Sequence, residues 1–226
     1  MRNLMRASLA IVLKDLSIEW RTKTAFASGL VFAVLMLAVL FFSRDPTAVS
    51  AQDIAAGALW VTFTFAAMLG LNRAFLLENE QRAIDAILLT PAPRSALFWG
   101  KFAGNLVFVG MIEAISLPLF VLFYDVVVWP YLPQLVLVIT MSTVAFVAVG
   151  TLFSAMAVRT RYAELLLPLL LLPFLIPPLV GGVQLTARLL EGRPLSDLSG
   201  WLRLIGAFDI AFVTLAALLF EVVVEE

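Results

Sequence analysis

The chain of 226 residues contains no histidine and no cysteine. These two residue types are the usual protein ligands of zinc and copper, and they are frequent axial ligands of haem iron. Their absence leaves only less common iron ligands, such as methionine or tyrosine. It also excludes a disulfide, a Ser-His catalytic triad, a histidine-ligated zinc hydrolase and a proton relay through histidine. We therefore expect no directly bound cofactor or metal.

The sequence also lacks the G-x-x-x-x-G-K-[ST] loop that cradles nucleotide phosphates. The chain is therefore not expected to bind and hydrolyse ATP by itself. Because the histidine-based sites are missing as well, we expect it not to be an enzyme. The formal net charge of −1 gives no indication of nucleic-acid binding.

Charge is scarce, and apolar residues dominate. Charged residues make up 14% of the chain and hydrophobic ones 62%, against about 25% and roughly 45–50% in soluble domains. The mean hydropathy is +1.03. Several apolar runs reach the length of about 20 residues that a transmembrane helix needs. The composition predicts an integral membrane protein that lies in a lipid bilayer.

Six apolar runs predict an all-α membrane protein with a single transmembrane domain over residues 1–226. In the fifth run proline recurs, and a proline-rich span is expected to be kinked. Residues 183–201 mix charges with leucines and are expected to lie on the membrane surface or to dip into it as a re-entrant hairpin. The spans are placed at about residues 25–42, 54–71, 102–123, 132–158, 163–182 and 202–224, and the kink at Pro168, Pro173, Pro177 and Pro178.

Residues 4–20 have the pattern of a basic amphipathic helix. Apolar residues share one stripe, and basic residues flank it; such a helix lies in the plane of the membrane interface. A cleavable signal peptide is the competing interpretation, but Lys14, Asp15 and Glu19 interrupt the apolar core that it requires. We therefore expect an uncleaved interfacial helix. The stripe consists of Leu9, Val12, Leu13, Leu16 and Trp20.

A polar segment separates the second and third spans and contains a second amphipathic helix, over about residues 78–90. Its apolar and charged residues fall on opposite faces at three-and-four spacing. Residues 90–93 (TPAP) end it, because proline has no amide hydrogen. A short helix between two spans is suited to receive motion from a soluble partner, so we expect a coupling helix. The expected contact residues are Glu80, Arg82, Ile84, Asp85, Leu88, Leu89 and Pro91.

Orientation follows from the distribution of the 15 Lys and Arg residues. Six spans place eleven of them on the side that holds both termini and the coupling helix, and four on the other side. Because loops rich in Lys and Arg stay in the cytoplasm, both termini are predicted to be cytoplasmic. The four on the outer side are Arg44, Arg188, Arg193 and Arg203.

Two of the acidic residues that fall within predicted spans, Glu113 and Asp209, are candidates for a role inside the membrane. Glu113 lies in the middle of the third span, where a carboxylate costs about 2.5–3.5 kcal/mol on insertion scales. It is either a functional group facing a partner or a wet cavity, or a protonated acid hydrogen-bonded to a neighbouring helix. Asp209 lies in the outer part of the sixth span and is expected to be a solvated or capping carboxylate.

The combination of an interfacial helix, six spans and a coupling helix resembles the membrane subunit of a type-2 ABC exporter. Within that group, residues 19–23 (EWRTK), 83–91 (AIDAILLTP) and 167–173 (LPLLLLP) are similar to the CcmB family. That family is the haem-exporter permease of bacterial cytochrome c maturation. The resemblance covers nearly the whole chain.

The resemblance implies the location and the partners of the chain. The location would be the bacterial inner membrane. The partners would be a cytoplasmic ABC ATPase in two copies, a haem-handling membrane protein and a periplasmic haem chaperone, with a homodimer of this chain in the complex. ATP would act through the ATPase, and haem would be a possible cargo.

Two other functions are compatible with the same sequence. One is a type-2 ABC permease for another cargo, such as a lipid or a drug. The other is a proton-coupled secondary carrier that uses Glu113. Such carriers usually contain internal repeats in hydropathy, and no convincing repeat is present here.

Overall fold

The computed structural model describes residues 2–80, 94–157 and 163–225, and all of its regular elements there are helices. The helices are α1 (Arg2–Thr22), α2 (Thr24–Ser43), α3 (Ala51–Glu80), α5 (Arg94–Tyr124), α6 (Leu132–Ala157), α7 (Ala163–Leu190) and α8 (Ser199–Glu225). Short 3-10 turns precede α6 and α8, at Trp129–Tyr131 and Leu195–Leu198. Six of these helices, all except α1, are long and apolar enough to cross a membrane. The predicted all-α membrane architecture is therefore confirmed.

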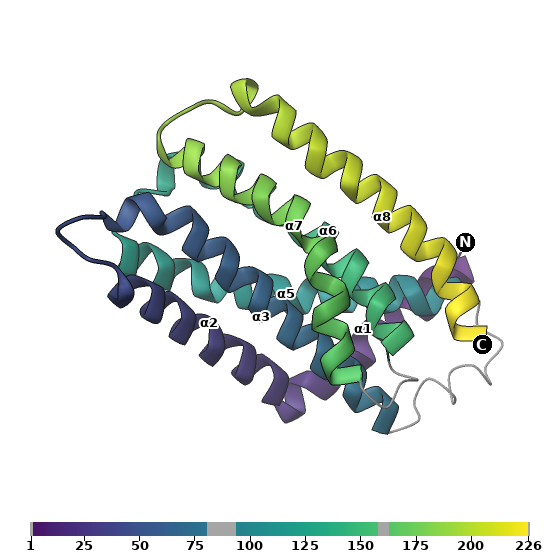
Figure 1. The fold of residues 1–226 in the computed structure, drawn as a ribbon. Helices are drawn as coiled ribbons and strands as arrows, with labels where there is room; N and C mark the ends of the chain where they lie inside the picture. Colours follow the sequence, from purple (N-terminus) through teal and green to yellow (C-terminus); the bar gives the residue numbers. More distant parts are fainter. Residues whose placement is uncertain (1, 81–93, 158–162, 226) are drawn as a thin grey trace.

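The helices form one bundle (Figure 1). The start of α1 and the end of α8 lie at one end of it, and the α2–α3, α5–α6 and α7–α8 connections lie at the other (Figure 1). The α2–α3 turn is shaped by Asp45, whose Oδ1 accepts hydrogen bonds from the Thr47 amide and hydroxyl. Those bonds hold the pKa of the exposed Asp45 carboxyl below its usual value.

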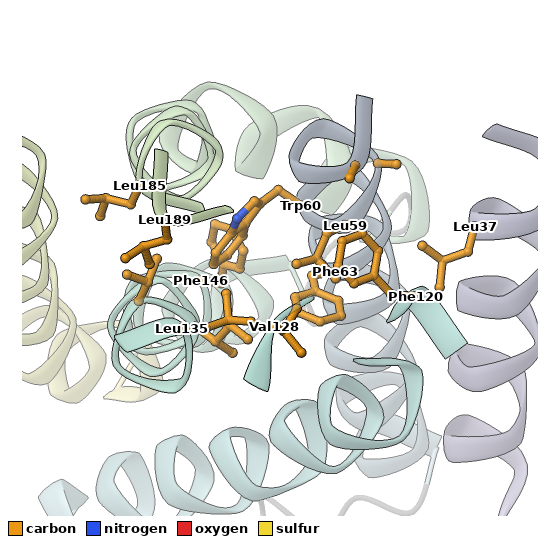
Figure 2. Packing of buried hydrophobic residues seen from close by; sticks show 14 of the residues in the cluster. Leu37, Leu59, Trp60, Phe63, Phe120, Val128, Leu135, Phe146, Leu185 and Leu189 are labelled. Atoms are coloured by element: carbon orange, nitrogen blue, oxygen red, sulfur yellow. The ribbon is translucent and has the colours of Figure 1, made fainter. Parts of the chain in front are cut away.

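The largest apolar core surrounds α3 (Figure 2). Trp60 and Phe63 of α3 are fully buried, and the Trp60 ring packs edge-on against both Phe63 and Phe146 of α6. Leu37 of α2 and Leu185 of α7 close the cluster on two other sides. The central position of α3 thus ties the helices of the bundle together. In contrast, α2 and α8 expose apolar side chains that are suited to lipid, among them Val31, Leu35, Val39, Ile210 and Leu218.

Helices α3, α5 and α7 extend well beyond the predicted spans, and α3 continues to Glu80. α5 starts at Arg94, ahead of the predicted span, and α7 continues to Leu190, so residues 183–190 belong to α7. The connection to α8 is residues 191–198. Packing explains why α7 continues past residue 182, because Gly181 and Gly182 lie against Ile205 and Trp60 inside the bundle. α7 is one helix through Pro168, Pro173, Pro177 and Pro178, and its axis changes direction along its length (Figure 1).

Candidate functional site

The predicted coupling helix falls mostly outside the described residues, and this includes Arg82, Ile84, Asp85, Leu88, Leu89 and Pro91. Glu80 is the last residue of α3, and Arg94 is the first of α5. Both helix ends lie at the end of the bundle that holds the start of α1 and the end of α8 (Figure 1). The predicted coupling segment is therefore bracketed by two helices of the bundle, α3 and α5.

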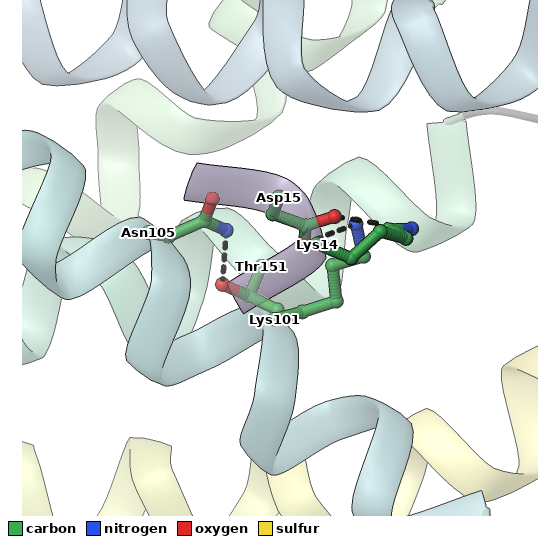
Figure 3. A network of polar contacts seen from close by, with 5 residues as sticks. All are labelled: Lys14, Asp15, Lys101, Asn105 and Thr151. Carbon is green, nitrogen blue, oxygen red and sulfur yellow. Dashed lines mark hydrogen bonds and ion pairs between the residues drawn. The ribbon is translucent and has the colours of Figure 1, made fainter. Parts of the chain in front are cut away.

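A buried ion pair joins α1 to α5 near the start of α5. The Lys101 Nζ atom donates a hydrogen bond to Asp15 Oδ2 at 2.7 Å, and Lys101 is only 5% exposed (Figure 3). Lys14 reaches the other carboxylate oxygen of Asp15 at 3.1 Å. A charge taken out of water needs such a partner, because an uncompensated buried charge is strongly unfavourable. The ion pair therefore fixes where α1 sits along α5.

Small residues let α1 approach α5 closely at the same place. A Cβ atom added to Gly100 would lie 2.7 Å from Ile11 Cβ, which is closer than real side chains pack. Gly104 faces Asp15, and the Ser8 hydroxyl donates to the Ala96 carbonyl at 3.1 Å. The residues Ala96, Gly100 and Gly104 thus form a groove in α5 that receives one face of α1. We refer to this contact, with the Lys101–Asp15 pair, as the α1–α5 joint.

The opposite face of α1 is apolar and exposed. Met5, Leu9, Leu13 and Trp20 are all more than half exposed. A helix docked on one side with an apolar stripe on another is suited to the membrane interface. The chain then turns into α2 at Lys23, which has a positive φ of 55°, and the Phe26 amide donates to Glu19 Oε1 at 2.7 Å. Glu19 therefore satisfies one of the free amides at the start of α2.

Polar side chains also link the helices inside the bundle. Glu113 of α5 is 4% exposed, and the Thr143 hydroxyl of α6 lies 2.8 and 2.9 Å from its two carboxyl oxygens. Closer to the α1–α5 joint, the Asn105 side-chain amide donates to the Thr151 hydroxyl at 3.1 Å (Figure 3). Both contacts join α5 to α6, so the helix that bears the α1–α5 joint is also hydrogen-bonded to the next one.

Asp209 lies well inside α8 and away from the helix ends. Its Oδ1 atom is buried without a hydrogen-bond partner in the part of the chain that the structure describes. No described residue caps or pairs with this oxygen, so the structure brings no second group of chemical interest to it.

Sequence reasoning did not single out Asp15, Lys101, Asn105 or Thr151 as linking residues. The sequence did set Asp15 apart, because it lies off the apolar stripe of the predicted interfacial helix. Its partner was not identifiable from a single sequence, since Asp15 and Lys101 are 86 residues apart. Residue spacing reports which residues share a helical face, but it does not report which helix packs against that face.

The described residues contain no group of three or more Asp and Glu side chains placed to hold a metal ion. What they do contain is a set of interhelical polar contacts in a bundle of apolar, span-length helices. The class of protein so defined is an all-α, multi-pass membrane protein.

Comparison with known proteins gives the family. Residues 6–225 match the family described as CcmB protein, and the chain belongs to that family. It is 30% identical to "Heme exporter protein B" of Rhodobacter capsulatus over 212 residues, which cover 92% of this chain and 95% of that protein. It is 29% identical to the protein of the same name from Paracoccus denitrificans, over 79% of this chain and 82% of that protein. The "Heme exporter protein B" of Pseudomonas aeruginosa is 26% identical, over 91% and 92%. The resemblance to the CcmB family seen in short motifs is therefore confirmed over almost the whole chain.

Proposed function

We propose that this chain is the membrane (permease) subunit of an ABC transporter complex that delivers haem in bacterial cytochrome c maturation. The observation that carries the proposal is membership of the CcmB family over residues 6–225, together with relatives named heme exporter proteins. The chain is non-catalytic in this proposal. A separate cytoplasmic ABC ATPase, in two copies, hydrolyses ATP. The resulting motion is transmitted to a homodimer of this chain.

The proposed location is the bacterial inner membrane with both termini in the cytoplasm. The distribution of Lys and Arg supports this orientation. It puts the predicted coupling segment and the α1–α5 joint on the side where the ATPase would bind. The partners on the other side are a haem-handling membrane protein and a periplasmic haem chaperone.

The role proposed for the chain is to transmit motion rather than to ligate the iron. It has no histidine and no cysteine, the side chains that most often bind haem iron. The α1–α5 joint supports the mechanical role, because it makes a two-helix unit at the point where α5 leaves the predicted coupling segment. ATP-driven displacement of that segment would move α1 and α5 together, and the α5–α6 contacts would pass the motion on.

The first experiment is affinity purification of the tagged chain in mild detergent, with identification of the co-purifying proteins and an absorption spectrum for haem. Recovery of an ABC ATPase with haem-handling partners is expected. Recovery of an ATPase without those partners would favour an ABC permease for another cargo. Absence of any ATPase, under conditions that preserve other membrane complexes, would overturn the ABC assignment and favour a carrier that uses Glu113.

A double charge reversal tests the coupling helix. Arg82→Glu with Asp85→Lys is expected to abolish ATPase association or its coupling, while membrane insertion is retained. The matched control reverses the exposed Glu191–Arg193 pair, whose charged atoms lie 3.4 Å apart in the α7–α8 connection. That variant, Glu191→Lys with Arg193→Glu, carries the same change on the opposite side and should behave as wild type. Normal ATPase association and cytochrome c maturation in the first variant would sink the coupling-helix assignment.

A further inference from the structure

The distances around Thr143 show how many hydrogens its contact with Glu113 needs. The Thr143 Oγ1 atom lies 2.8 Å from Glu113 Oε1, 2.9 Å from Glu113 Oε2 and 2.8 Å from the Ile139 carbonyl oxygen. All three neighbours are acceptors when Glu113 is ionised, yet a threonine hydroxyl has a single hydrogen to donate. An ionised Glu113 would therefore leave close oxygen pairs without a hydrogen between them.

One additional proton gives a directed hydrogen bond to two of the three oxygen pairs of this contact, and the acid's carbonyl oxygen lies close to Thr143 Oγ1 because both carboxyl oxygens share one carbon. If Glu113 is a neutral carboxylic acid, its O–H donates to Thr143 Oγ1, and the Thr143 hydroxyl donates in turn to the Ile139 carbonyl. The hydroxyl then gives one hydrogen and accepts one, within its ordinary capacity. The hydrogen bonds form a directed chain from α5 into the backbone of α6.

The surroundings of Glu113 provide no positive charge to stabilise a carboxylate. Glu113 is buried, and it forms no ion pair in the described part of the chain. α2 and α6, which pack against α5, contain no charged residue at all. The cations of α5 itself, Arg94 and Lys101, lie three or more turns away, and Lys101 is paired with Asp15.

The other helices packed against α5 carry their charges elsewhere. In α3 the charged residues are Asp53 in the first turn and Arg73, Glu78 and Glu80 towards the other end. α1 touches α5 near its start, through Ser8, Ile11 and Asp15. α8 approaches α5 through Phe220 and Phe98, and its charged residues are Arg203, Asp209, Glu221 and Glu225. Among the side chains that the structure describes, Asp209 is the other carboxyl within a span helix that a test has to separate from Glu113.

We propose that Glu113 is a proton-binding site, and that the bound proton makes a latch that holds α5 against α6. The neutral acid donates to Thr143, and the latch is closed in this structure. Release passes the proton to water that enters between the two helices, and it leaves a carboxylate that must be hydrated. Ser142, next to Thr143 in the chain, has a hydroxyl that is buried without a hydrogen-bond partner among the described residues. The protonation state of Glu113 therefore determines how strongly α5 and α6 are held together.

Infrared spectroscopy of the purified full chain in lipid nanodiscs tests the bound proton. The wild-type protein is expected to show the C=O stretch of a protonated carboxylic acid, shifted by exchange into heavy water. Glu113→Gln should remove that band, and its amide should keep the contact with Thr143. Asp209→Asn is the matched control and should keep the Glu113 band. Thr143→Val should retain the band at a higher wavenumber, because the acid loses its hydrogen-bond acceptor. An unchanged band in Glu113→Gln, or its loss only in Asp209→Asn, would overturn the proposal.

A distance measurement tests the latch, and the absence of native cysteine makes it direct. Spin labels at Ile115→Cys in α5 and Leu137→Cys in α6 occupy exposed positions near the contact. The distance between the labels should increase as pH rises through the loss of the acid band. The same pair in Glu113→Gln should stay at the short distance at every pH, because its donor cannot be titrated. A distance that is constant while the wild-type acid band disappears, or one that responds equally in Glu113→Gln, would overturn the latch.

Discussion

Lys101 and Asp15 lie 86 residues apart in the sequence, yet their side chains meet at 2.7 Å between α1 and α5. The lysine side chain is 6% exposed and the aspartate 23%. The pair therefore stands at the boundary between water and the bundle interior. It attaches α1 to α5 and so makes α1 part of the bundle.

Removing the negative member of this pair should loosen α1. Asp15→Asn takes the counter-charge from a buried ammonium, and breaking a buried pair costs about 3–5 kcal/mol. Because Asp15 retains contact with water, we expect about 2–3 kcal/mol here. Thermal unfolding in detergent measures the loss. Glu191→Gln, which breaks the exposed Glu191–Arg193 pair, is the matched control and should cost less than about 1 kcal/mol. A charge swap, Asp15→Lys with Lys101→Asp, should recover part of the stability; no loss in Asp15→Asn would contradict the role of the pair.

Gly100 should tolerate no side chain while α1 is docked. In Gly100→Ala the new Cβ would lie 2.7 Å from Ile11 Cβ, so α1 must shift, and overpacking costs about 1–3 kcal/mol. Gly110→Ala on the same helix is the matched control, because nothing lies within 4 Å of its added Cβ. That control should be neutral or more stable by up to about 1 kcal/mol. Ile11→Gly, which removes the Cβ atom that the new side chain would meet, should relieve the clash in Gly100→Ala. Equal melting temperatures of the two glycine variants would show that the α1–α5 groove is not closely packed.

Much of the fold was predictable because the membrane imposes a simple rule on the sequence. A span needs about 20 apolar residues, and the runs that contain Val31, Val136 and Ile210 satisfy it without reference to any partner helix. Glu113 stands out in the sequence for the same reason, since a carboxyl within an apolar run is costly. Its two interpretations could not be separated by sequence. The close oxygen contacts at Thr143 favour the protonated acid, because only geometry shows how many hydrogens the contact requires.

The helix ends and the interhelical contacts could not be predicted, because both depend on packing. The fifth span was predicted to end at about residue 182, yet α7 continues to Leu190, with Ile205 and Trp60 lying where side chains on Gly181 and Gly182 would be. Lys101 was counted only as a cytoplasmic cation in the charge distribution. Its burial follows from the position of α1, and no periodicity in either segment determines that position.

The close contact between Trp60 of α3 and Gly182 of α7 should be important for the stability of the bundle. A Cβ on Gly182 would lie 2.6 Å from the Trp60 ring, and the Trp60 Nε1–H donates to the buried Thr186 hydroxyl at 2.8 Å. Gly182→Ala is expected to lower the free energy of unfolding by about 1–3 kcal/mol. Gly57→Ala in α3, where nothing lies within 4 Å, is the control. Thermal melts of both variants check this, and a Gly182→Ala protein as stable as Gly57→Ala would refute it.

Asn105 and Thr151 should behave as a coupled pair rather than as two independent residues. Thr151→Val leaves the buried Asn105 amide without the acceptor that now lies 3.1 Å away, which costs about 1–3 kcal/mol in general. Interhelical hydrogen bonds in membranes average about 0.6 kcal/mol, so we expect a loss of about 1 kcal/mol.

The double variant Asn105→Leu with Thr151→Val should be close to wild type, because an apolar pair leaves no unsatisfied group. Melting temperatures of the two single variants and the double variant form a double-mutant cycle. Losses that simply add in the double variant would show that the hydrogen bond contributes nothing to joining α5 and α6. Non-additive losses, with the double variant more stable than Thr151→Val alone, would place this contact beside Glu113–Thr143 as a second polar link between the same two helices.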